Sequence, residues 1–570
     1  MLKTLYCLLV LSAIACSSQT TIGGTAANPR IANAVDLGRV PPGTEFDFVL
    51  GLQIRNEAGL HKFLANQSLT RDELTPIDFG DAFGVSAARY AYLVSWVRVH
   101  GMEVVRTNVG RTSITVHATA EAIERAFGTQ MHDFEDSAGR FTASLSNLTF
   151  DPDVAPVVSG TVGLSGERPW LSHRVTQPRP LPNAGGTPCS LANGQGNVSM
   201  GALDLQALYG YAGAAVTSPG MGETVVILGA GPGPDPAVDV QPYVDAYGLG
   251  TNVGVQYKPI HLGGPSRETG MAATGEQGEN TLDVDMVLAL APFATVAHVL
   301  TATNNPGLLT DGVSYIVNDS TLSKAHSVTL SYGSCERGSA GGMPVLNALF
   351  AQAEAQGQQW FSASGDTATD GCRDGAGNKI ISATWPASSP NVVSVGGTGL
   401  ATPQTSVTVD TAEATWSSGG GGVSESFDKP AFQTGIGPGA GDSSRDVPDV
   451  AAIADPATGV CVAQGGPPTG GVGGTSAAAP MWAAVWAVVH QAVHASKGET
   501  AFSTGLLTIY AIGKNIPAAT TRANQPLKDV SAGAIKGPGG GINGYPAGAG
   551  YDLATGWGTP NLAKLIAVWQ

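Results

Sequence analysis

Short stretches in which apolar and polar residues alternate dominate the chain between about residues 36 and 170. Their spacing predicts helices over residues 71–79, 86–100 and 120–127, and strands over 103–107, 111–117 and 131–134. Helices and strands that follow one another at such short intervals are typical of a compact α+β domain. We find no group of residues in this region with the chemistry of a catalytic site.

From about residue 203 the apolar runs become longer and are separated by helical patterns. Strands are predicted over residues 224–229, 328–332 and 360–363, and helices over 239–247, 281–291, 344–356 and 477–493. This order of elements indicates a largely parallel sheet that is covered on both faces. In such sheets, functional residues gather in the loops that leave the carboxyl ends of the strands.

The start of the chain has the pattern of an export signal. Lys3 precedes an apolar run over residues 5–15, which ends in the small-residue sequence Ala-Ile-Ala. The run is shorter than the ~20 residues that a membrane-spanning helix needs. We therefore expect residues 1–15 to be a signal peptide and the protein to be secreted. The next residue is Cys16, so both a lipid anchor on Cys16 and plain secretion stay open.

Two segments have the composition of linkers. Residues 16–35 are small and polar, and residues 174–198 are rich in proline, asparagine and glycine. Exposed linkers of this kind are where proteolytic nicking concentrates. We therefore expect a first domain over residues 36–170, a processing linker over 171–198 and a second domain over 199–570.

Composition narrows the range of partners. The chain has 570 residues, of which 77 are glycine, about twice the average frequency, and only 13% are charged. The net charge of −16, without a stripe of lysine or arginine, argues against a nucleic-acid partner. With only 29 basic residues, the chain gains limited positive charge in acid, which is compatible with a protein that works there.

Four cysteines follow the signal region, and no two of them have the Cys-x-x-Cys spacing of a zinc or thioredoxin site. One disulfide is expected in an exported protein. Cys335 and Cys372 each follow one of two strands that we expect to be neighbours, so a bridge between them is reasonable. Cys461 is expected as a buried strand cysteine, and Cys189 lies in the processing linker.

A candidate nucleophile, Ser476, lies in the sequence Gly-Gly-Thr-Ser-Ala-Ala-Ala-Pro, directly before the apolar helix over 477–493. A serine in this position commonly caps the helix. The two glycines before it, however, let the backbone approach a bound chain closely. A nucleophilic serine also needs a base. None of the ten histidines lies in the His-Gly-Thr-x-x-Ala context of a subtilisin; we expect His298 in the core and His261 in a loop.

Glu279 and Asp283 offer a different base. They lie four residues apart at a predicted helix start, so both carboxylates can share one face of the helix. Two close carboxylates titrate as a pair, in which one can hold a proton while the other accepts one. The alternative is an acidic first turn that complements the helix dipole. We expect the neighbouring Asp285 to be a surface residue of that kind.

Asp366 comes just after the strand predicted over residues 360–363, in the sequence Ser-Gly-Asp. An aspartate in this place usually forms a turn or a cap. In acid it can instead hold a proton and donate a hydrogen bond to a developing oxyanion.

Taken together, Glu-x-x-x-Asp, Ser-Gly-Asp and Gly-Thr-Ser-x-x-x-Pro in this chain order resemble the sedolisin (serine-carboxyl peptidase) family, especially its kumamolisin-like members. Further matches are Ser-Tyr-Gly at 331–333, Val-Gly-Gly-Thr at 395–398, Val-Pro-Asp-Val at 447–450 and Thr-Gly-Trp-Gly-Thr-Pro at 555–560. The resemblance covers nearly everything after about residue 190, and residues 36–170 resemble the family's prodomain. It implies a subtilisin-like, mainly parallel seven-stranded sheet flanked by helices, preceded by an α+β, ferredoxin-like prodomain.

The resemblance also implies roles for the four candidate residues. Ser476 would attack the peptide carbonyl, Glu279 would act as general base and then acid, Asp283 would orient Glu279, and Asp366 would support the oxyanion. A glutamate still titrates in acid, where a histidine base is already protonated, so activity should peak at acidic pH. The chain would be a self-processing zymogen of an endopeptidase, acting on polypeptides, inhibited by its own prodomain and monomeric.

One calcium ion is a further implication of the resemblance. Hard oxygen ligands suit this ion, and the implied set is the carboxylates of Asp529 and Asp552 with the carbonyls of Val530, Gly548 and Gly550. The alternative is a glycine-rich loop with two turn aspartates.

Two other functions stay open. One is a tripeptidyl-peptidase of the same family, and the other is a catalytically silent, surface-anchored binding protein on this scaffold. A histidine-dependent subtilisin is disfavoured by the missing histidine motif.

Overall fold

The computed structural model describes residues 20–21, 29–70, 72–137, 139–176, 189–191, 199–214, 216–263, 276–339, 341–368, 372–373, 378–438, 440–498, 505–517, 520–537 and 544–569. The predicted signal peptide, Cys16 and most of both predicted linkers lie outside these residues. No helix among the described residues is both long and apolar enough to cross a membrane.

The N-terminal domain is built on a four-stranded antiparallel sheet with the strand order β4-β5-β3-β9. This order, with helices between β3 and β4 and between β5 and β9, is the ferredoxin-like arrangement that was predicted. The elements are β3 (Glu45–Leu52), α3 (Ala87–Val99), β4 (Glu103–Thr107), β5 (Ser113–Thr119), α4 (Ala120–Phe127) and β9 (Val158–Val162). Apolar residues of both helices, such as Trp96 and Phe127, pack on Phe48 and Ile114 of the sheet. A second small sheet joins β2 (Val35–Arg39), β6 (Met131–Asp136) and β7 (Gly139–Ser144).

The helix predicted over residues 71–79 is wrong in its bounds. The chain instead forms α1 (Glu57–Thr70) and, separately, α2 (Pro76–Ala82). Thr75 starts α2, because its hydroxyl accepts a hydrogen bond from the Asp78 amide while the Asp78 carboxylate accepts from Thr75. Asn56 starts α1, because its side-chain oxygen accepts a hydrogen bond of 3.0 Å from the Gly59 amide, and contacts with the C-terminal domain stabilise this region.

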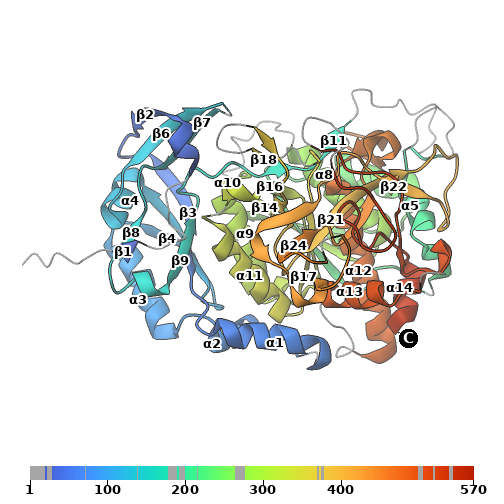
Figure 1. Ribbon diagram of the computed structural model, residues 1–570, viewed down its shortest axis with the longest axis horizontal. Coiled ribbons are helices and arrows are strands. Elements are labelled where there is room, and N and C mark those ends of the chain that lie inside the picture. Colours follow the sequence, from blue (N-terminus) through green and yellow to red (C-terminus); the bar gives the residue numbers. More distant parts are fainter. Residues whose placement is uncertain are drawn as a thin grey trace, which may run out of the picture.

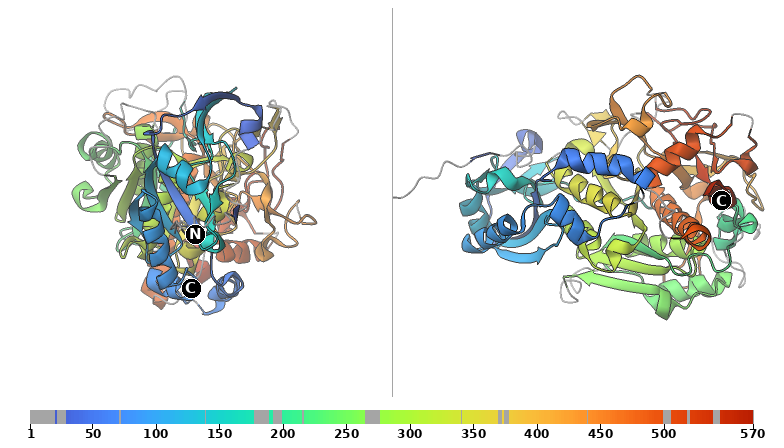
Figure 2. Two further views of the ribbon diagram at one scale, coloured as in Figure 1. Left: turned by 90° about the vertical axis from the view of Figure 1, so that its left-hand side faces the viewer. Right: turned by 90° about the horizontal axis from the view of Figure 1, so that it is seen from below.

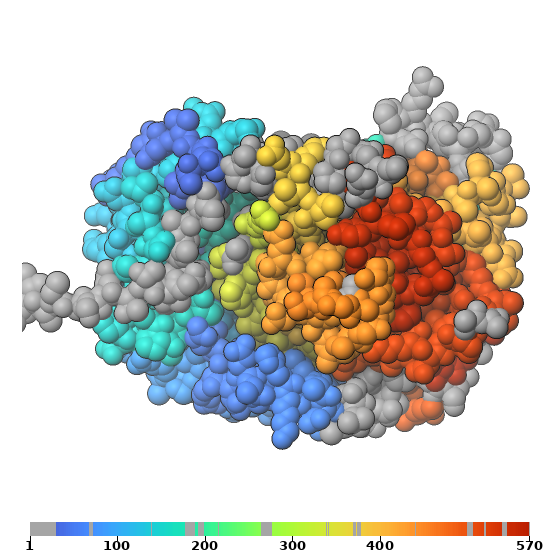
Figure 3. Space-filling model, viewed as in Figure 1, coloured from blue at the N-terminus to red at the C-terminus, as the bar shows by residue number. Residues whose placement is uncertain are grey.

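Helices α1 and α2 extend from the N-terminal domain along the C-terminal domain, as the views from the front and from below show (Figures 1 and 2). Leu60, Leu64 and Phe79 form one buried cluster with Ala351 and Ala355 of α11 (Met343–Ala355). In the space-filling view the N-terminal domain, in blue and cyan, lies directly against the rest of the molecule (Figure 3).

Polar contacts complete this interface. The β4–β5 hairpin faces α9 (Pro306–Asn318), where Asp311 accepts hydrogen bonds from Arg106 at 3.0 Å and from Thr115 at 2.5 Å. The Asn108 amide donates to the Ser314 hydroxyl on the same helix. The N-terminal domain is therefore docked on α9 and α11 through buried hydrogen bonds as well as apolar packing.

The C-terminal domain contains a sheet whose described strands follow the order β13-β14-β12-β15-β17-β21-β22, with β25 also paired to β21. Seven of these strands are parallel, as predicted, and β22 is antiparallel. Their bounds are β12 (Thr224–Ala230), β13 (Tyr257–Leu262), β14 (Thr295–Thr301), β15 (Ser327–Leu330), β17 (Gln359–Ala363), β21 (Val393–Leu400), β22 (Glu413–Thr415) and β25 (Val450–Ile453).

Helices cover both faces of this sheet, because successive side chains of a strand point to opposite faces. Val225 and Ile227 of β12 belong to the core formed with α8 (Glu276–Leu290) and α12 (Thr475–Lys497). Val226 and Leu228 belong to the core formed with α9 and α11. Shorter helices at the periphery are α5 (Ala202–Leu208), α6 (Gln241–Tyr247), α13 (Gly505–Lys514) and α14 (Leu562–Trp569).

His298 and His261 both lie on strands of the large sheet. His298 is fully buried on β14, as expected. His261 was expected in a loop but lies on β13, the edge strand of the sheet. The following Leu-Gly-Gly suggested a loop, yet pairing with β14 extends the strand to Leu262.

Two disulfides are present among the described residues, where one was expected. The bridge between Cys335 and Cys372 joins Cα atoms 5.1 Å apart, as anticipated. Cys461 does lie on a buried strand, β26 (Val460–Val462), but it is bonded to Cys189, 272 residues earlier. A pairing across such a distance has no local signature in the sequence. It ties residue 189 of the predicted processing linker to the C-terminal domain.

Candidate active site

An extended segment of the chain, residues 171–176, crosses the carboxyl edge of the large sheet. Its first part, β10 (Leu171–Ser172), pairs antiparallel with β16 (Tyr332–Cys335), and its second part, β11 (Val175–Thr176), pairs with β27 (Thr469–Gly473). Between them, the amide of His173 donates to the Ser331 carbonyl at 3.1 Å. The segment is therefore bound as an added strand, the way that extended peptides are bound by sheet edges.

Ser476 lies at the point where this segment passes the start of α12. Its side chain is fully buried, and its backbone N–H donates to the carbonyl oxygen of His173 at 3.1 Å. Two residues earlier, Gly474 has φ +102°, and a Cβ there would lie 1.9 Å from the same carbonyl oxygen. Glycine is thus required by both its backbone conformation and the close approach of the segment.

Asp366 follows β17 and faces the same place. Its Oδ1 accepts hydrogen bonds from the amide of Thr475 at 2.7 Å and from its hydroxyl at 2.8 Å. Its Oδ2 is buried without a partner among the described groups and lies 2.5 Å from the position of a Cβ on Gly474, beside the His173 carbonyl. Burial raises the pKa of Asp366 to about 7, although the two bonds from Thr475 oppose the rise. A protonated Asp366 can therefore donate toward that carbonyl.

Glu279 and Asp283 lie one turn apart on α8, and both are fully buried. Burial, followed by the charge of Asp283, raises the pKa of Glu279 well above its usual value, while the nearby Ser476 hydroxyl and the Arg174 guanidinium oppose the rise. Burial likewise raises the pKa of Asp283. Two acids held together in this way favour a shared proton at acidic pH.

Ser331 connects these groups. Its hydroxyl donates to Asp283 Oδ1 at 2.7 Å, and its carbonyl oxygen accepts a hydrogen bond of 3.4 Å from the Ser476 hydroxyl. The structure therefore brings together all four residues that the motifs singled out, although they are spread over nearly 200 positions of the sequence.

Asp285 is not the surface residue that was expected. It is fully buried, and its Oδ2 accepts a hydrogen bond of 2.8 Å from the amide of Ala463. Burial raises its pKa well above the usual value. Helix α8 is buried on all sides over this stretch, so the position that looked like a solvated first turn anchors a neighbouring loop instead.

The five residues of the predicted calcium site also lie together. Asp529 follows β28 (Leu527–Lys528), and its Oδ2 accepts from the amide of Gly550 at 3.1 Å. Asp552 Oδ2 accepts from the amide of Gly548 at 2.8 Å, and the Val530 carbonyl accepts from Thr555. Asp529 Oδ1 is buried without a hydrogen-bond partner among the described residues. An oxygen-rich pair of loops with an unsatisfied carboxylate oxygen fits a hard cation.

Comparisons with known proteins agree with this geometry. A family model described as the pro-kumamolisin activation domain matches residues 32–166. Kumamolisin from Bacillus sp. (strain MN-32) is 28% identical, over 86% of this chain and 84% of its own. Sedolisin from Pseudomonas sp. (strain 101) is 27% identical over 95% of this chain and 90% of its own. The solved structure of Pseudomonas sedolisin with two molecules of pseudo-iodotyrostatin covers 65% of this chain and 98% of that one, with 26% identity and a TM-score of 0.53.

The chain belongs to the sedolisin family of serine-carboxyl peptidases. Tripeptidyl-peptidase 1 from Rattus norvegicus is a more partial relative, 30% identical over 44% of each chain. As a member of this family with an activation domain, the protein is the zymogen of a serine-carboxyl peptidase.

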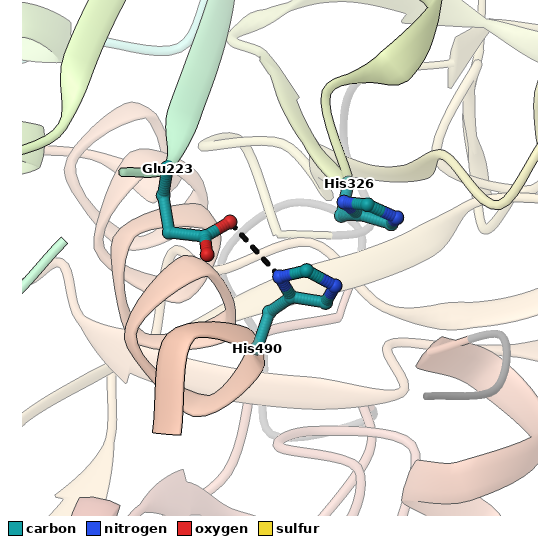
Figure 4. A group of neighbouring side chains, drawn as sticks. All are labelled: Glu223, His326 and His490. Atoms are coloured by element: carbon teal, nitrogen blue, oxygen red, sulfur yellow. Dashed lines mark hydrogen bonds and ion pairs between the residues drawn. The ribbon is translucent and has the colours of Figure 1, made fainter. Parts of the chain in front are cut away.

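A second cluster of polar side chains in this sedolisin-family protein is formed by Glu223, His326 and His490 (Figure 4). Glu223 precedes β12, His326 precedes β15 and His490 lies on α12; in the described part of the chain they are the one group of three that offers ligand atoms within 4.8 Å of one another. His490 Nδ1 lies 2.9 Å from Glu223, and the two imidazoles stack with centroids 3.8 Å apart. Their in-plane lone pairs therefore run side by side, so one ring would have to turn before both could bind one metal ion.

Sequence reasoning missed the segment over 171–176 and the bridging role of Ser331. In the sequence, Ser-Tyr-Gly at 331–333 stands out only as a family match, and residues 171–176 are predicted to belong to a linker. A short apolar–polar alternation from Leu171 to Thr176 was the one signal that could have shown a strand there. Its partner strands lie more than 150 residues away, so the pairing itself had no local signal.

Proposed function

We propose that the chain is the secreted, self-processing zymogen of an acid-active serine-carboxyl endopeptidase. The observation that carries the proposal is the position of the His173 carbonyl, which accepts the Ser476 N–H beside the buried carboxyl of Asp366. Donors aimed at a carbonyl oxygen next to a serine hydroxyl are the arrangement of an oxyanion hole. The segment over 171–176 thus lies as a substrate would lie.

The chemistry follows from the same contacts. Glu279, as a carboxylate, takes the proton of the Ser476 hydroxyl as its oxygen attacks the carbonyl carbon, and Asp283 holds Glu279 in place. The Ser476 N–H and a protonated Asp366 stabilise the oxyanion. Glu279 then returns its proton to the leaving amine, and water repeats the sequence on the acyl-enzyme. Because Asp366 must be protonated while Glu279 must exchange a proton, this site works in acid.

We assign the processing bond to His173–Arg174. The register supports this: the amide and the carbonyl of His173 are both bonded, to Ser331 and Ser476, while the chain continues in pairing on either side. A cut there leaves Cys189 on the peptidase, held to Cys461. It falls near the start of the processing linker that was predicted over residues 171–198.

An endopeptidase is favoured over a tripeptidyl-peptidase because the bound chain continues beyond the third residue before the bond. Trp170, Leu171 and Ser172 precede His173 in bound conformation, and the Trp170 amide donates to the Asn304 carbonyl at 3.0 Å. The tripeptidyl-peptidase relative keeps the second function open as a candidate. Product lengths from one defined peptide separate the two.

A bound calcium ion is part of the proposal. Asp529 and Asp552 would hold it with the carbonyls of Val530, Gly548 and Gly550, and the ion would supply positive charge that neutralises two carboxylates between surface loops. Its role is to fix these loops, which lie in the chain between the paired strands β28 and β29 (Thr559–Pro560), and it takes no part in the reaction.

The proposal is tested by incubating the purified chain across about pH 3 to 7, alongside Ser476→Ala, and following cleavage by gel and intact mass. We expect acid-dependent loss of the N-terminal domain in the wild type only, followed by degradation of casein. If both proteins stay intact and inactive at every pH, a catalytically silent binding protein becomes the better interpretation.

A further inference from the structure

The half-buried side chain of Arg174 lies between Gln464 and the start of α8, a position that the motifs did not indicate. Its guanidinium donates to Gln464 Oε1 at 3.3 Å. On its other side it lies against the start of α8, where a Cβ on Gly278 would be 2.5 Å from the guanidinium and 3.1 Å from Gln464 Oε1. A side chain at position 278 would therefore fill the space that the guanidinium occupies.

Gln464 is held in place by its two neighbours. The amide of Ala463 donates to Asp285 at 2.8 Å, and the amide of Gly465 donates to Asp239 at 2.7 Å. Both aspartates are buried, with exposed fractions of 0% and 2%. Two buried carboxylates thus fix the backbone on either side of Gln464, and its exposed side chain reaches the guanidinium from this support.

The surroundings of the guanidinium also carry a negative charge. Burial lowers the pKa of Arg174, and the Glu279 carboxylate opposes this by favouring the charged guanidinium; in return the guanidinium favours the ionised form of Glu279. Among the groups described around Glu279, the other charges that act on it are the acids Asp283 and Asp366. A cation from the bound chain therefore compensates charge that the peptidase itself leaves uncompensated.

We propose that Gly278, Gln464 and Glu279 form a subsite that selects an arginine side chain directly after the scissile bond of polypeptide substrates. This rests on the proposed function, because it takes His173–Arg174 as the bond that is cut. The peptidase would then prefer substrates that resemble its own processing segment, and an arginine in this position would help to keep Glu279 ionised as the reaction begins.

The test uses the acid-activated full chain and internally quenched peptides containing Leu-Ser-His-Xaa-Val-Thr, in which Xaa is arginine, citrulline, alanine or glutamate. Citrulline keeps the shape of arginine without its charge. We expect kcat/KM for the arginine peptide to exceed that for citrulline at least tenfold. The acid limb of the pH profile should also lie at lower pH with arginine than with citrulline, a shift that shape alone would not cause.

Two variants sharpen the assignment, each scored as the ratio of kcat/KM for arginine to that for alanine on the same protein. Gly278→Ala should lower this ratio severalfold, because the guanidinium must move away from the new methyl group and from Gln464. Gln464→Glu should raise it severalfold. Gln404→Ala, which removes an exposed amide bonded to Thr402, is the matched control and should leave the ratio unchanged.

The outcomes separate the inference from the function on which it rests. If no peptide is cut by the wild type in acid, the proposed function fails. If all four peptides are cut with equal kcat/KM, or if mass spectrometry places the cut elsewhere than before Xaa, the peptidase is active and the arginine subsite is overturned.

Discussion

Two buried glutamates of this protein have opposite electrostatic surroundings. Glu413 on β22 lies 2.6 Å from Arg522 and 3.4 Å from Lys528, and burial, which would raise its pKa, is outweighed by these cations, so that the pKa is lowered. Glu279 on α8 is as deeply buried, but its main neighbour is Asp283 and its pKa is raised. Glu413 is therefore held ionised, whereas Glu279 is easily protonated, although both are buried glutamates.

The difference shows what the fold adds to burial. Burial alone disfavours the charged form of any carboxylate, and only a compensating cation or hydrogen bonds reverse the effect. Where the peptidase supplies cations, as around Glu413, the acid stabilises the structure. Where it supplies a second acid, as beside Glu279, the group is prepared to exchange protons, as a general base in acid must.

The largest effects are expected when the charge of each glutamate is removed in turn. Glu279→Gln should lower the rate of self-processing about 10³-fold or more, because it removes the proposed general base. Glu413→Gln should instead leave Lys528 uncompensated in the interior and cost about 3–5 kcal/mol of unfolding free energy. The first effect is measured by gel and mass in acid, and the second by urea unfolding of Ser476→Ala proteins.

The control for this result is the stability of the Glu279→Gln variant. Glu279→Gln in the Ser476→Ala background should not lose stability, since it replaces an uncompensated buried acid by a neutral group. Equal losses of stability at both positions would show that the two glutamates are alike and would contradict the comparison.

Substitutions of Asp366 test the role of the third acid of the site. Asp366→Ala should reduce kcat about 10²- to 10³-fold, because it removes a donor from the oxyanion. Asp366→Asn keeps a donor that does not titrate. The wild type loses its Asp366 proton as pH rises through about 7, so the Asn variant should retain a larger share of its pH 5 activity at pH 7.5. Identical losses in the two variants would exclude a hydrogen-bonding role.

The stability of the zymogen should depend on pH in the direction set by these acids. Asp366, with a pKa raised to about 7 in the fold, contributes stability that is present below its unfolded pKa of about 4 and is lost as pH rises toward 7. In the Ser476→Ala protein this loss is roughly 1 kcal/mol per pH unit. Adding Asp366→Asn should flatten the slope between pH 5 and 7, as followed by thermal unfolding. An unchanged slope would remove Asp366 from this account.

The smallest expected effect is the loss of stability when the proposed calcium ion is removed from Asp529. Removing calcium from the Ser476→Ala protein with a chelator should cost about 1.4 kcal/mol at an ion concentration ten times Kd. Asp529→Asn should abolish the difference between calcium and chelator, as measured by thermal unfolding. A chelator effect that persists in this variant would place the ion elsewhere.

Much of this architecture could be predicted from local pattern. The bounds of β4 and α4 agree with the prediction, because alternation at period two and a clear apolar helix face decide them. The motifs also identified Ser476, Glu279, Asp283 and Asp366, since each lies in a short sequence with its own chemistry. The structure brings these four together, while their roles remain proposals.

What could not be predicted depends on contacts between distant parts of the chain. Asp285 looks solvated in sequence, and only the packing of α8 against the loop at Ala463 buries it. The bridge from Cys189 to Cys461 and the pairing of residues 171–176 with two strands of the peptidase are equally non-local. The site was therefore predictable as a set of residues, and its bound segment was not.

The most direct test of self-processing by Ser476 is the identity of the first bond that the zymogen cuts in acid. N-terminal sequencing and intact mass of the wild type, sampled early at about pH 4 beside Ser476→Ala, give this bond. The account predicts a new N-terminus at Arg174 in the wild type and no cut in the variant. A first cut at another bond, or the same cut in Ser476→Ala, would contradict it.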